Sequence, residues 1–312
     1  MKNISHQVLS IKYQVSRLAT CYLLPVTCLL FSCTSVIQVS VPNGTQNLVV
    51  DAFIDNSTKV QTVRLTYSAN YFNNVPCPAV LGATVGLTDL TNAQTFTFTP
   101  DGKGNYTYTP TTTDTMCYIN HKYQLNVSYN GNTYIALSTL FPTIPVDRII
   151  FCNSAINPID TISNAADTSK PRRYYPYFFA KDIKGVGNFY WVKVYRNNIL
   201  YSDPGQMDLF EDGGGFTADG DEIGGANCYF NITDDKHPIH RNDTCTIAIY
   251  STDANTNDFL GQLVTQMTNS QNGLFAVTPQ NVKTNIQQTS GSQPAIGWFN
   301  MAAVKSKSVV AK

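Results

Sequence analysis

Apolar and polar residues alternate over short stretches of the chain from residue 48 onward. Between residues 62 and 67, for example, Val63, Leu65 and Tyr67 alternate with polar residues. A period of two residues is typical of a strand with one buried face. Runs of this kind or mostly apolar runs predict strands over 48–54, 62–67, 84–90, 95–99, 106–108, 123–129 and 133–140.

Turn signals separate several of these predicted strands. Asn130-Gly131 is a strong hairpin signal because both residues accept a positive φ, and residues 101–104 form a second glycine-rich turn. Short strands joined by such turns, without a helical pattern between them, are typical of a β-sandwich. We therefore expect a first domain over residues 48–141 that is a β-sandwich.

The segment 141–146 contains Pro142 and Pro145 and marks a boundary, because proline cannot sit in a central strand. Beyond it, strands are predicted over 147–151, 174–179, 189–195, 245–250 and 295–299, with a hairpin turn at 184–188. Residues 253–267 carry apolar residues at helical spacing, and Asp253 is a candidate N-cap. The sequence thus predicts a second β-sandwich-type domain over 146–304 with one short helix, and a frayed tail over 305–312.

The N-terminal segment is typical of an export signal. Lys2, Lys12 and Arg17 precede an apolar run over 18–32, which is too short to span a bilayer comfortably. The run ends in Leu30-Phe31-Ser32-Cys33, which resembles a bacterial lipobox. We expect residues 1–32 to be a lipoprotein signal peptide, Cys33 to be lipidated and residues 33–47 to be a tether. An uncleaved anchor, or a secretory signal cut elsewhere, is the alternative.

Charge narrows the classes of function. The chain has 312 residues, of which 13% are charged, and its 21 basic and 21 acidic residues balance. A nucleic-acid-binding protein usually has a clustered basic excess, so no nucleic-acid partner is expected. Loss of residues 1–32 removes three basic residues and no acid, which leaves 18 basic and 21 acidic residues and a net charge of −3.

Five cysteines remain after Cys33. An exported protein can keep disulfides, and Cys77 with Cys117 and Cys228 with Cys245 are candidate pairs that leave Cys152 unpaired. The sequence does not fix this connectivity, and scattered thiols with one or two bridges are the simpler interpretation.

Two clusters are candidate sites. Seven of the 21 acids lie between residues 203 and 222 among glycines, which indicates either a solvated acidic loop or a calcium site, since calcium prefers several oxygen ligands in flexible loops. The candidate calcium ligands are Asp208, Asp212, Asp219, Asp221 and Glu222. No other cofactor is expected.

The second cluster is aromatic. Because alternate residues of a strand face outward, part of it is expected at the surface as a ligand or partner site, whereas burial in a core is the alternative. The aromatic residues of this cluster are Tyr174, Tyr175, Tyr177, Phe178, Phe179, Phe189, Tyr190, Trp191 and Tyr195, and Arg172 and Arg173 lie at its edge. The residues assigned to the candidate surface are Arg172, Arg173, Tyr174, Tyr175, Tyr177, Tyr190 and Trp191. The mature chain has three histidines and no catalytic motif, so we do not expect an enzyme.

Several short motifs occur in a characteristic order. They are Leu48 to Phe53, Gly82-Ala83-Thr84-Val85, Gly104-Asn105-Tyr106, Gly187 to Tyr195, Asp208-Leu209-Phe210, Asn281 to Ile286 and Ala295 to Phe299. In this order they resemble the Bacteroidota lipoprotein family known as domain of unknown function 4249 (DUF4249). The segment from Gly82 to Tyr106 is also similar to carboxypeptidase-regulatory-like and other immunoglobulin-like modules, which implies that the first domain, 48–141, is an immunoglobulin-like β-sandwich.

The resemblance implies a lipid-anchored protein of the outer membrane, on either its periplasmic or its surface face, often encoded beside a TonB-dependent outer-membrane transporter. It supplies no catalytic residues. The expected function is therefore a non-enzymatic binding or accessory module for such a transporter, held at the membrane through Cys33. A structural or adhesive surface lipoprotein is the alternative.

Overall fold

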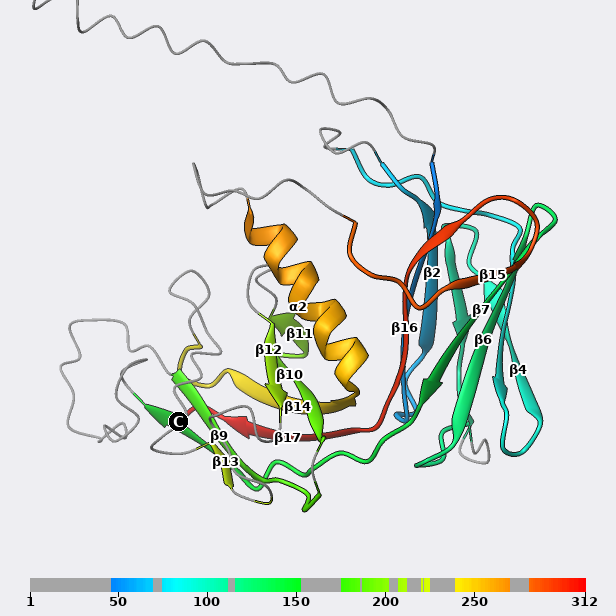
Figure 1. The fold of residues 1–312 in the computed structure, drawn as a ribbon. Coiled ribbons are helices and arrows are strands. Elements are labelled where there is room, and N and C mark those ends of the chain that lie inside the picture. Colours follow the sequence, from blue (N-terminus) through cyan, green and yellow to red (C-terminus); the bar gives the residue numbers. More distant parts are fainter. Residues whose placement is uncertain are drawn as a thin grey trace, which may run out of the picture. The chain divides into compact units, whose positions relative to one another are not determined.

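The computed structural model describes residues 46–69, 75–111, 116–152, 175–185, 187–201, 207–211, 220, 222–224, 239–269 and 281–312 (Figure 1). Within Thr45–Lys312, which form one compact unit, the described chain contains three sheets and one helix. The prediction of a mainly β protein with sandwich-type packing is confirmed. None of the described helices is long and apolar enough to cross a membrane.

The largest sheet has nine strands in the order β15-β7-β6-β3-β4-β5-β2-β1-β16. They are β1 (Leu48–Asp55), β2 (Gln61–Tyr67), β3 (Thr84–Asp89), β4 (Gln94–Pro100), β5 (Asn105–Tyr108), β6 (Lys122–Tyr129), β7 (Asn132–Thr139), β15 (Gln287–Ser290) and β16 (Ala295–Ala302). Strands β1 to β7 lie where the sequence predicts them, and β1, β2 and β6 bury alternate apolar residues.

This sheet curls until its two ends approach each other. β4 pairs with β3 along most of its length and with β5 at Thr99 and Pro100, so it links the two halves. At the other side, the Met301 amide of β16 donates to Ser138 Oγ of β7 at 2.9 Å. The enclosed core is apolar and includes Leu48, Ile54, Leu65, Leu87, Leu125 and Phe299, all at most 1% exposed. Burial of side chains of this size stabilises a fold by about 1.5–3 kcal/mol each.

The predicted hairpin at Asn130-Gly131 is confirmed. Both residues have positive φ, 47° and 73°, and β6 pairs with β7 on either side of them. The turn at 101–104 is also present, with the Asp101 carboxylate accepting from the Lys103 and Asn105 amides. Local turn chemistry therefore specifies this part of the fold.

The second half contains two smaller sheets that enclose a second core. The five-stranded sheet consists of β10 (Phe189–Arg196), β11 (Ile199–Tyr201), β12 (Asp208–Glu211), β14 (Thr244–Thr252) and β17 (Val304–Val310). The three-stranded sheet consists of β8 (Arg148–Cys152), β9 (Tyr175–Lys181) and β13 (Glu222–Gly224). Phe178 of the smaller sheet and Tyr190, Val192 and Ile247 of the larger one pack in the same cluster.

The expected hairpin between the strands at 174–179 and 189–195 is wrong. β9 pairs with β8 and β13, whereas β10 pairs with β14, β12 and β11. The connecting segment is held by Asn188 Nδ2, which donates to the Ile183 carbonyl at 2.8 Å. The turn therefore carries the chain from one sheet to the other, and the two aromatic strands face each other across the core instead of pairing.

Helix α2 (Ala254–Thr268) confirms the predicted helix and its cap. The Asp253 carboxylate accepts from the Thr256 amide at 2.7 Å, which satisfies one of the free N–H groups of the first turn. Phe259 of α2 stacks on Trp298 of β16, with ring centroids 4.7 Å apart. Trp298 Nε1 donates to Thr256 Oγ1 at 3.0 Å, so the helix is fixed on the outer face of β16.

The C-terminal strands differ from the expected domain organisation. β15 and β16 lie within the expected second domain, 146–304, yet β16 pairs in parallel with β1 of the first sheet along its length. The tail, expected to fray, forms β17 and pairs with β14. Only Ala303 separates β16 from β17, and it exchanges two hydrogen bonds with Ser251. Chain order does not determine strand partners, so the sequence pattern alone could not reveal this link.

Candidate functional site

The outer face of β10 carries three residues at alternate positions: Trp191, Lys193 and Tyr195. They are half-buried, whereas Tyr190 and Val192 between them point into the second core and are at most 4% exposed. Period-two alternation therefore separates the strand into a core face and an outer face.

The outer face of β1 meets this surface. Val50, Ala52 and Ile54 of β1 fill the first core, so Phe53 points outward together with Asp51 and Asp55, which flank it at alternate positions. The Phe53 ring contacts Trp191 edge-to-face, with centroids 5.4 Å apart and planes at 72°. The two sheets thus meet through β1 and β10.

At this junction the Lys193 ammonium lies among aromatic rings. Its Nζ is 3.7 Å from the Trp191 ring centroid and 4.4 Å from that of Tyr250 on β14. Tyr250 and Tyr195 share a hydrogen bond between their hydroxyls at 3.1 Å. A cation held over ring faces in this way is stabilised by about 0.5–2 kcal/mol. We call Asp51, Phe53, Asp55, Trp191, Lys193, Tyr195 and Tyr250 the Lys193 cluster.

Desolvation shifts the pKa values of two charged groups in the Lys193 cluster. Desolvation lowers the pKa of Lys193 to about 8, against the opposing charges of Asp55 and Asp51. Desolvation also raises the pKa of Asp51, although Arg64 and Lys193 act in the other direction. Yet among the described residues neither carboxylate forms an ion pair with Lys193, and no other acceptor lies within hydrogen-bonding distance of its Nζ. The cluster therefore offers an unused ammonium donor, carboxylate acceptors and ring surface.

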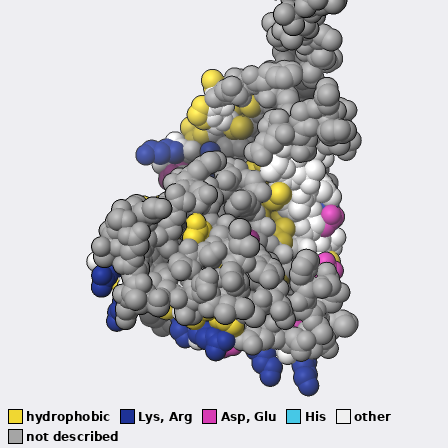
Figure 2. Space-filling model, turned by 90° about the vertical axis from the view of Figure 1, so that its left-hand side faces the viewer, with side chains coloured by type: hydrophobic (Ala, Val, Ile, Leu, Met, Phe, Trp, Pro, Cys, Tyr) yellow, Lys and Arg dark blue, Asp and Glu magenta, His cyan; other side chains and the backbone are white. Residues whose placement is uncertain are grey.

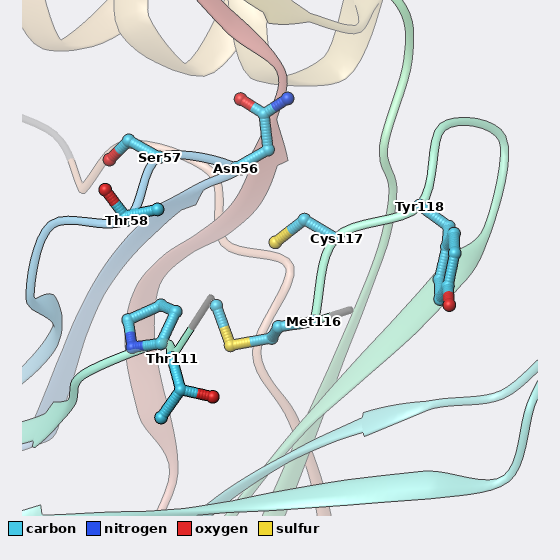
Figure 3. A pocket seen from close by; sticks show the side chains of 8 residues that line it. Asn56, Ser57, Thr58, Thr111, Met116, Cys117 and Tyr118 are labelled. Carbon is cyan, nitrogen blue, oxygen red and sulfur yellow. The ribbon is translucent and has the colours of Figure 1, made fainter. Parts of the chain in front are cut away.

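A small cavity of about 140 Å³ lies near the end of β1 (Figure 3). It is lined by uncharged residues: Asn56, Ser57, Thr58, Pro110, Thr111, Met116, Cys117 and Tyr118. The Cys117 thiol donates to the Asp55 carbonyl at 3.4 Å, and burial raises its pKa to about 12. This thiol therefore stays protonated at neutral pH and is a poor nucleophile.

The predicted aromatic surface is only partly at the surface. Tyr177 and Tyr190 are 3% and 2% exposed, and Tyr190 donates to the buried Asp182 carboxylate at 2.7 Å, so their assignment to a ligand surface is wrong. They fill the second core because β9 and β10 face it from opposite sheets. Tyr175 and Trp191 are half-buried, while Arg172, Arg173 and Tyr174 lie outside the described residues.

The predicted calcium ligands are spread over two sheets and undescribed segments. Asp208 lies on β12 and Glu222 on β13, whereas Asp212, Asp219 and Asp221 lie outside the described residues. Desolvation raises the pKa of Asp208 to about 6. The residues that can be described contain no group of three His, Cys, Asp or Glu side chains able to hold a metal, and the calcium site stays a prediction.

The candidate disulfides are not formed. Cys77, Cys117 and Cys245 carry free thiols, which leaves neither Cys77–Cys117 nor Cys228–Cys245 as a bridge. Cys117 lines the cavity, and its thiol donates a hydrogen bond to the Asp55 carbonyl of β1. Cys245 is buried in the second core, opposite Val309. Cys228 and the candidate lipidation residue Cys33 lie outside the described residues.

On the face seen in Figure 2, lysine and arginine side chains gather along the lower rim. Hydrophobic side chains form small separate patches on the same face. Among the described residues, the Lys193 cluster brings an ammonium group, two carboxylates and several rings together.

Comparison with known proteins identifies the family. The model of the domain of unknown function DUF4249 matches residues 34–308, which is nearly the whole chain. The chain belongs to the DUF4249 family. A search of curated proteins found no match. Among solved structures, a crystal structure of chicken CNTN1 FN1-FN3 domains is similar at 10% identity, covering 69% of this chain and 63% of that one, with a TM-score of 0.23. That likeness is too weak to support an argument.

In this DUF4249 chain, the sequence pattern indicated Trp191 and Tyr195 but not their neighbours Lys193, Asp51, Asp55 and Tyr250. The alternation over 189–195 contains a signal for Lys193 and Tyr195, because it places them on the same face as Trp191. No local pattern indicates that β1 meets this face.

Proposed function

We propose that this DUF4249 protein is a non-enzymatic binding or accessory module of the cell envelope that works with a TonB-dependent outer-membrane transporter. The observation that carries the proposal is the Lys193 cluster. It combines half-buried rings with a charged donor that has no acceptor among the described residues, and such mixed aromatic and polar surfaces are typical of recognition sites.

Two features of the sequence support the membrane location. The lipobox-like segment before Cys33 provides for a lipid anchor, and residues 33–47 provide a tether of 15 residues before β1. Lipid chains would hold the module in the same membrane as its partner. Confinement of this kind raises the effective concentration of two partners without strong intrinsic affinity.

The geometry of the titratable groups favours binding over catalysis. The half-buried Cys117 thiol has a raised pKa, and His121 Nδ1 donates to the Asp89 carboxylate, which also accepts from the Thr91 and Asn92 amides in the β3–β4 turn. This histidine–carboxylate pair thus stabilises a turn. We propose no reaction for this chain.

The proposal is tested by affinity purification of the tagged protein from solubilised outer membranes of its own host. We expect a TonB-dependent transporter to copurify, and Trp191→Ala to reduce its recovery. The control is Lys305→Met, which changes an exposed residue of β17. Cys33→Ser should move the protein out of the membrane fraction.

Recovery of the lipidated protein without any transporter would contradict the proposed role. Combined with protease accessibility on whole cells, that result would favour the structural or adhesive surface lipoprotein instead.

A further inference from the structure

The Lys193 ammonium has three N–H donors, and among the described residues no acceptor lies within hydrogen-bonding distance of it. A partly buried charge in this position lacks the hydration it has in water, and ring faces replace only part of that hydration. An anionic acceptor from a ligand would compensate the charge.

A second cation lies close by. Arg64 of β2 is exposed and stands opposite Asp51 in the β1–β2 register. Its charge and that of Lys193 both act on the Asp51 carboxyl. In the described part of the chain Arg64 forms no ion pair either. Two cations with unused donors therefore border the same carboxylate.

The surrounding charges limit what an incoming anion can be. Asp51 and Asp55 of β1 both interact with Lys193 through their charges, so a doubly charged group such as phosphate would be repelled by two carboxylates. A singly charged carboxylate meets less repulsion and matches the donors of lysine and arginine. The Tyr250 ring lies beside the ammonium and offers contact area for a ring or hydrocarbon chain. The Tyr195 hydroxyl is hydrogen-bonded to that of Tyr250, and the Tyr195 ring faces Lys59 Nζ, 5.8 Å from its centroid.

We propose that the Lys193 cluster binds a small monocarboxylate, with Lys193 as the main hydrogen-bond donor, Arg64 as the second cation and the Tyr250 ring against the remainder of the ligand. This inference deepens the proposed binding role and rests on it. An aromatic acid and a uronic acid share this chemistry, so both serve as probes.

The test is isothermal titration calorimetry on the purified full chain with benzoate and with glucuronate. Benzyl alcohol and glucose are the neutral counterparts of the two acids. We expect at least one acid to bind about tenfold or more tightly than its neutral counterpart at pH 7, because a hydrogen bond to a charged group contributes that much. If only benzoate binds, the ligand is a carboxylate attached to an apolar ring. If only glucuronate binds, the ligand is a sugar acid.

Three perturbations should weaken acid binding. Lys193→Met removes the donor and keeps an unbranched side chain one atom shorter, and Arg64→Gln removes the second cation. Raising the pH from 7 to 9.5 takes Lys193 through its pKa of about 8, which removes its charge. The groups that face Lys193 are Asp51 and Asp55 from β1 and Tyr250 from β14, and neither carboxylate gains a proton as the pH rises. Lys305→Met should leave binding unchanged.

A change in protonation gives an independent readout. A bound anion stabilises charged Lys193, so binding at pH 8 should take up protons. The measured heat should then differ between phosphate and Tris buffers.

Equal binding of acids and neutral counterparts, or no binding of either acid at millimolar concentration, would overturn the proposal. Unchanged acid binding by folded Lys193→Met would also overturn it. If that variant does not fold, the pH series and Arg64→Gln decide. These measurements use no transporter. A negative result would therefore overturn acid binding alone, and the transporter association would still be tested by the affinity purification.

Discussion

Gly297 of β16 occupies a position that no other residue can take. Its φ is +111°, and a Cβ atom there would lie 2.0 Å from the Val50 carbonyl oxygen of β1. The clash involves backbone that is paired on both sides, so it cannot relax by a rotamer change. We expect Gly297→Ala to lower the free energy of unfolding by roughly 3 kcal/mol or more, measured by chemical denaturation.

Gly261 is the matched control for this prediction. It lies within α2, and a Cβ atom there would meet nothing within 4 Å. Gly261→Ala should raise the free energy of unfolding by about 0.5–1 kcal/mol, because alanine favours the helix. A small effect of Gly297→Ala, similar to that of an ordinary surface change, would contradict the close approach of β16 to β1.

The second prediction at this scale concerns Lys193 and pH. Desolvation lowers its pKa to about 8 in the folded chain, whereas an unfolded lysine titrates at about 10.4. Between these values the unfolded chain holds a proton that the folded chain has lost, so this residue makes stability rise with pH. The free energy of unfolding of the wild type, relative to Lys193→Met, should therefore rise between pH 7 and pH 9.5.

Comparison with Lys193→Met removes the contribution of every other titrating group. Lys305→Met, which changes an exposed lysine, should show no such trend against the wild type. A parallel course of wild type and Lys193→Met across the whole range would mean that Lys193 is fully solvated.

Residue patterns predicted the faces of β10 but not what the outer face contacts. Alternation is enough to place Trp191, Lys193 and Tyr195 on one face of the strand, and the structure has them there. The desolvation of Lys193 depends on Phe53 and Tyr250, which lie far away in sequence. Long-range packing of this kind leaves no trace in a local pattern, so the candidate site could be predicted only in part.

At the scale of elements, the presence of a strand or helix was easier to predict than the strand with which each strand pairs. The strands up to β7, and α2 with its Asp253 cap, follow from alternation, turn residues and capping. The partners of β9, β10 and β16 do not, because a strand can pair with any compatible edge. Short polar strands such as β15, whose four residues are all exposed, bury no apolar face and so give no alternating signal.

The outer edge of β16 leads to a third prediction. The Asn285 side chain donates to the Phe299 carbonyl at 2.7 Å and accepts from the Phe299 amide at 2.9 Å. One side-chain amide thus replaces a neighbouring strand and satisfies both backbone groups. Asn285→Asp removes the donor and places a negative charge beside the carbonyl. We expect a loss of about 1–3 kcal/mol in the free energy of unfolding.

Asn92→Asp, in the exposed β3–β4 turn, is the isosteric control and should change stability by less than about 0.5 kcal/mol. The expected difference tests the clamp because both variants add the same charge. Equal stability of the two variants would show that Asn285 does not hold the edge of β16.

At the scale of the whole molecule, one C-terminal segment joins the two cores. β16 pairs with β1 and β17 with β14, and only Ala303 lies between them. Further links lie at the same place: the Val304 amide donates to Asn56 Oδ1 at 2.8 Å, and Thr143 Oγ1 donates to the Ile249 carbonyl at 3.1 Å. The segment β16–Ala303–β17 therefore belongs to both sheets. If either sheet unfolded, this segment would lose part of its pairing, and the other sheet would be destabilised with it.

The last prediction is that both halves unfold in one transition. The chain has two tryptophans: Trp298 lies on β16 of the first sheet and Trp191 on β10 of the second. Trp191→Phe and Trp298→Phe therefore leave one fluorescent reporter in each half. Within either variant, tryptophan fluorescence and far-ultraviolet circular dichroism should give the same denaturant midpoint, as two-state unfolding requires.

A substitution in the second core gives a second test. Ile247→Ala opens a cavity there and is added to each of the two variants. It should lower the midpoint reported by Trp298 by the same amount as that reported by Trp191. If Trp298 kept its original midpoint in that variant, the halves would unfold independently, and the boundary at residues 141–146 would separate two domains in the thermodynamic sense.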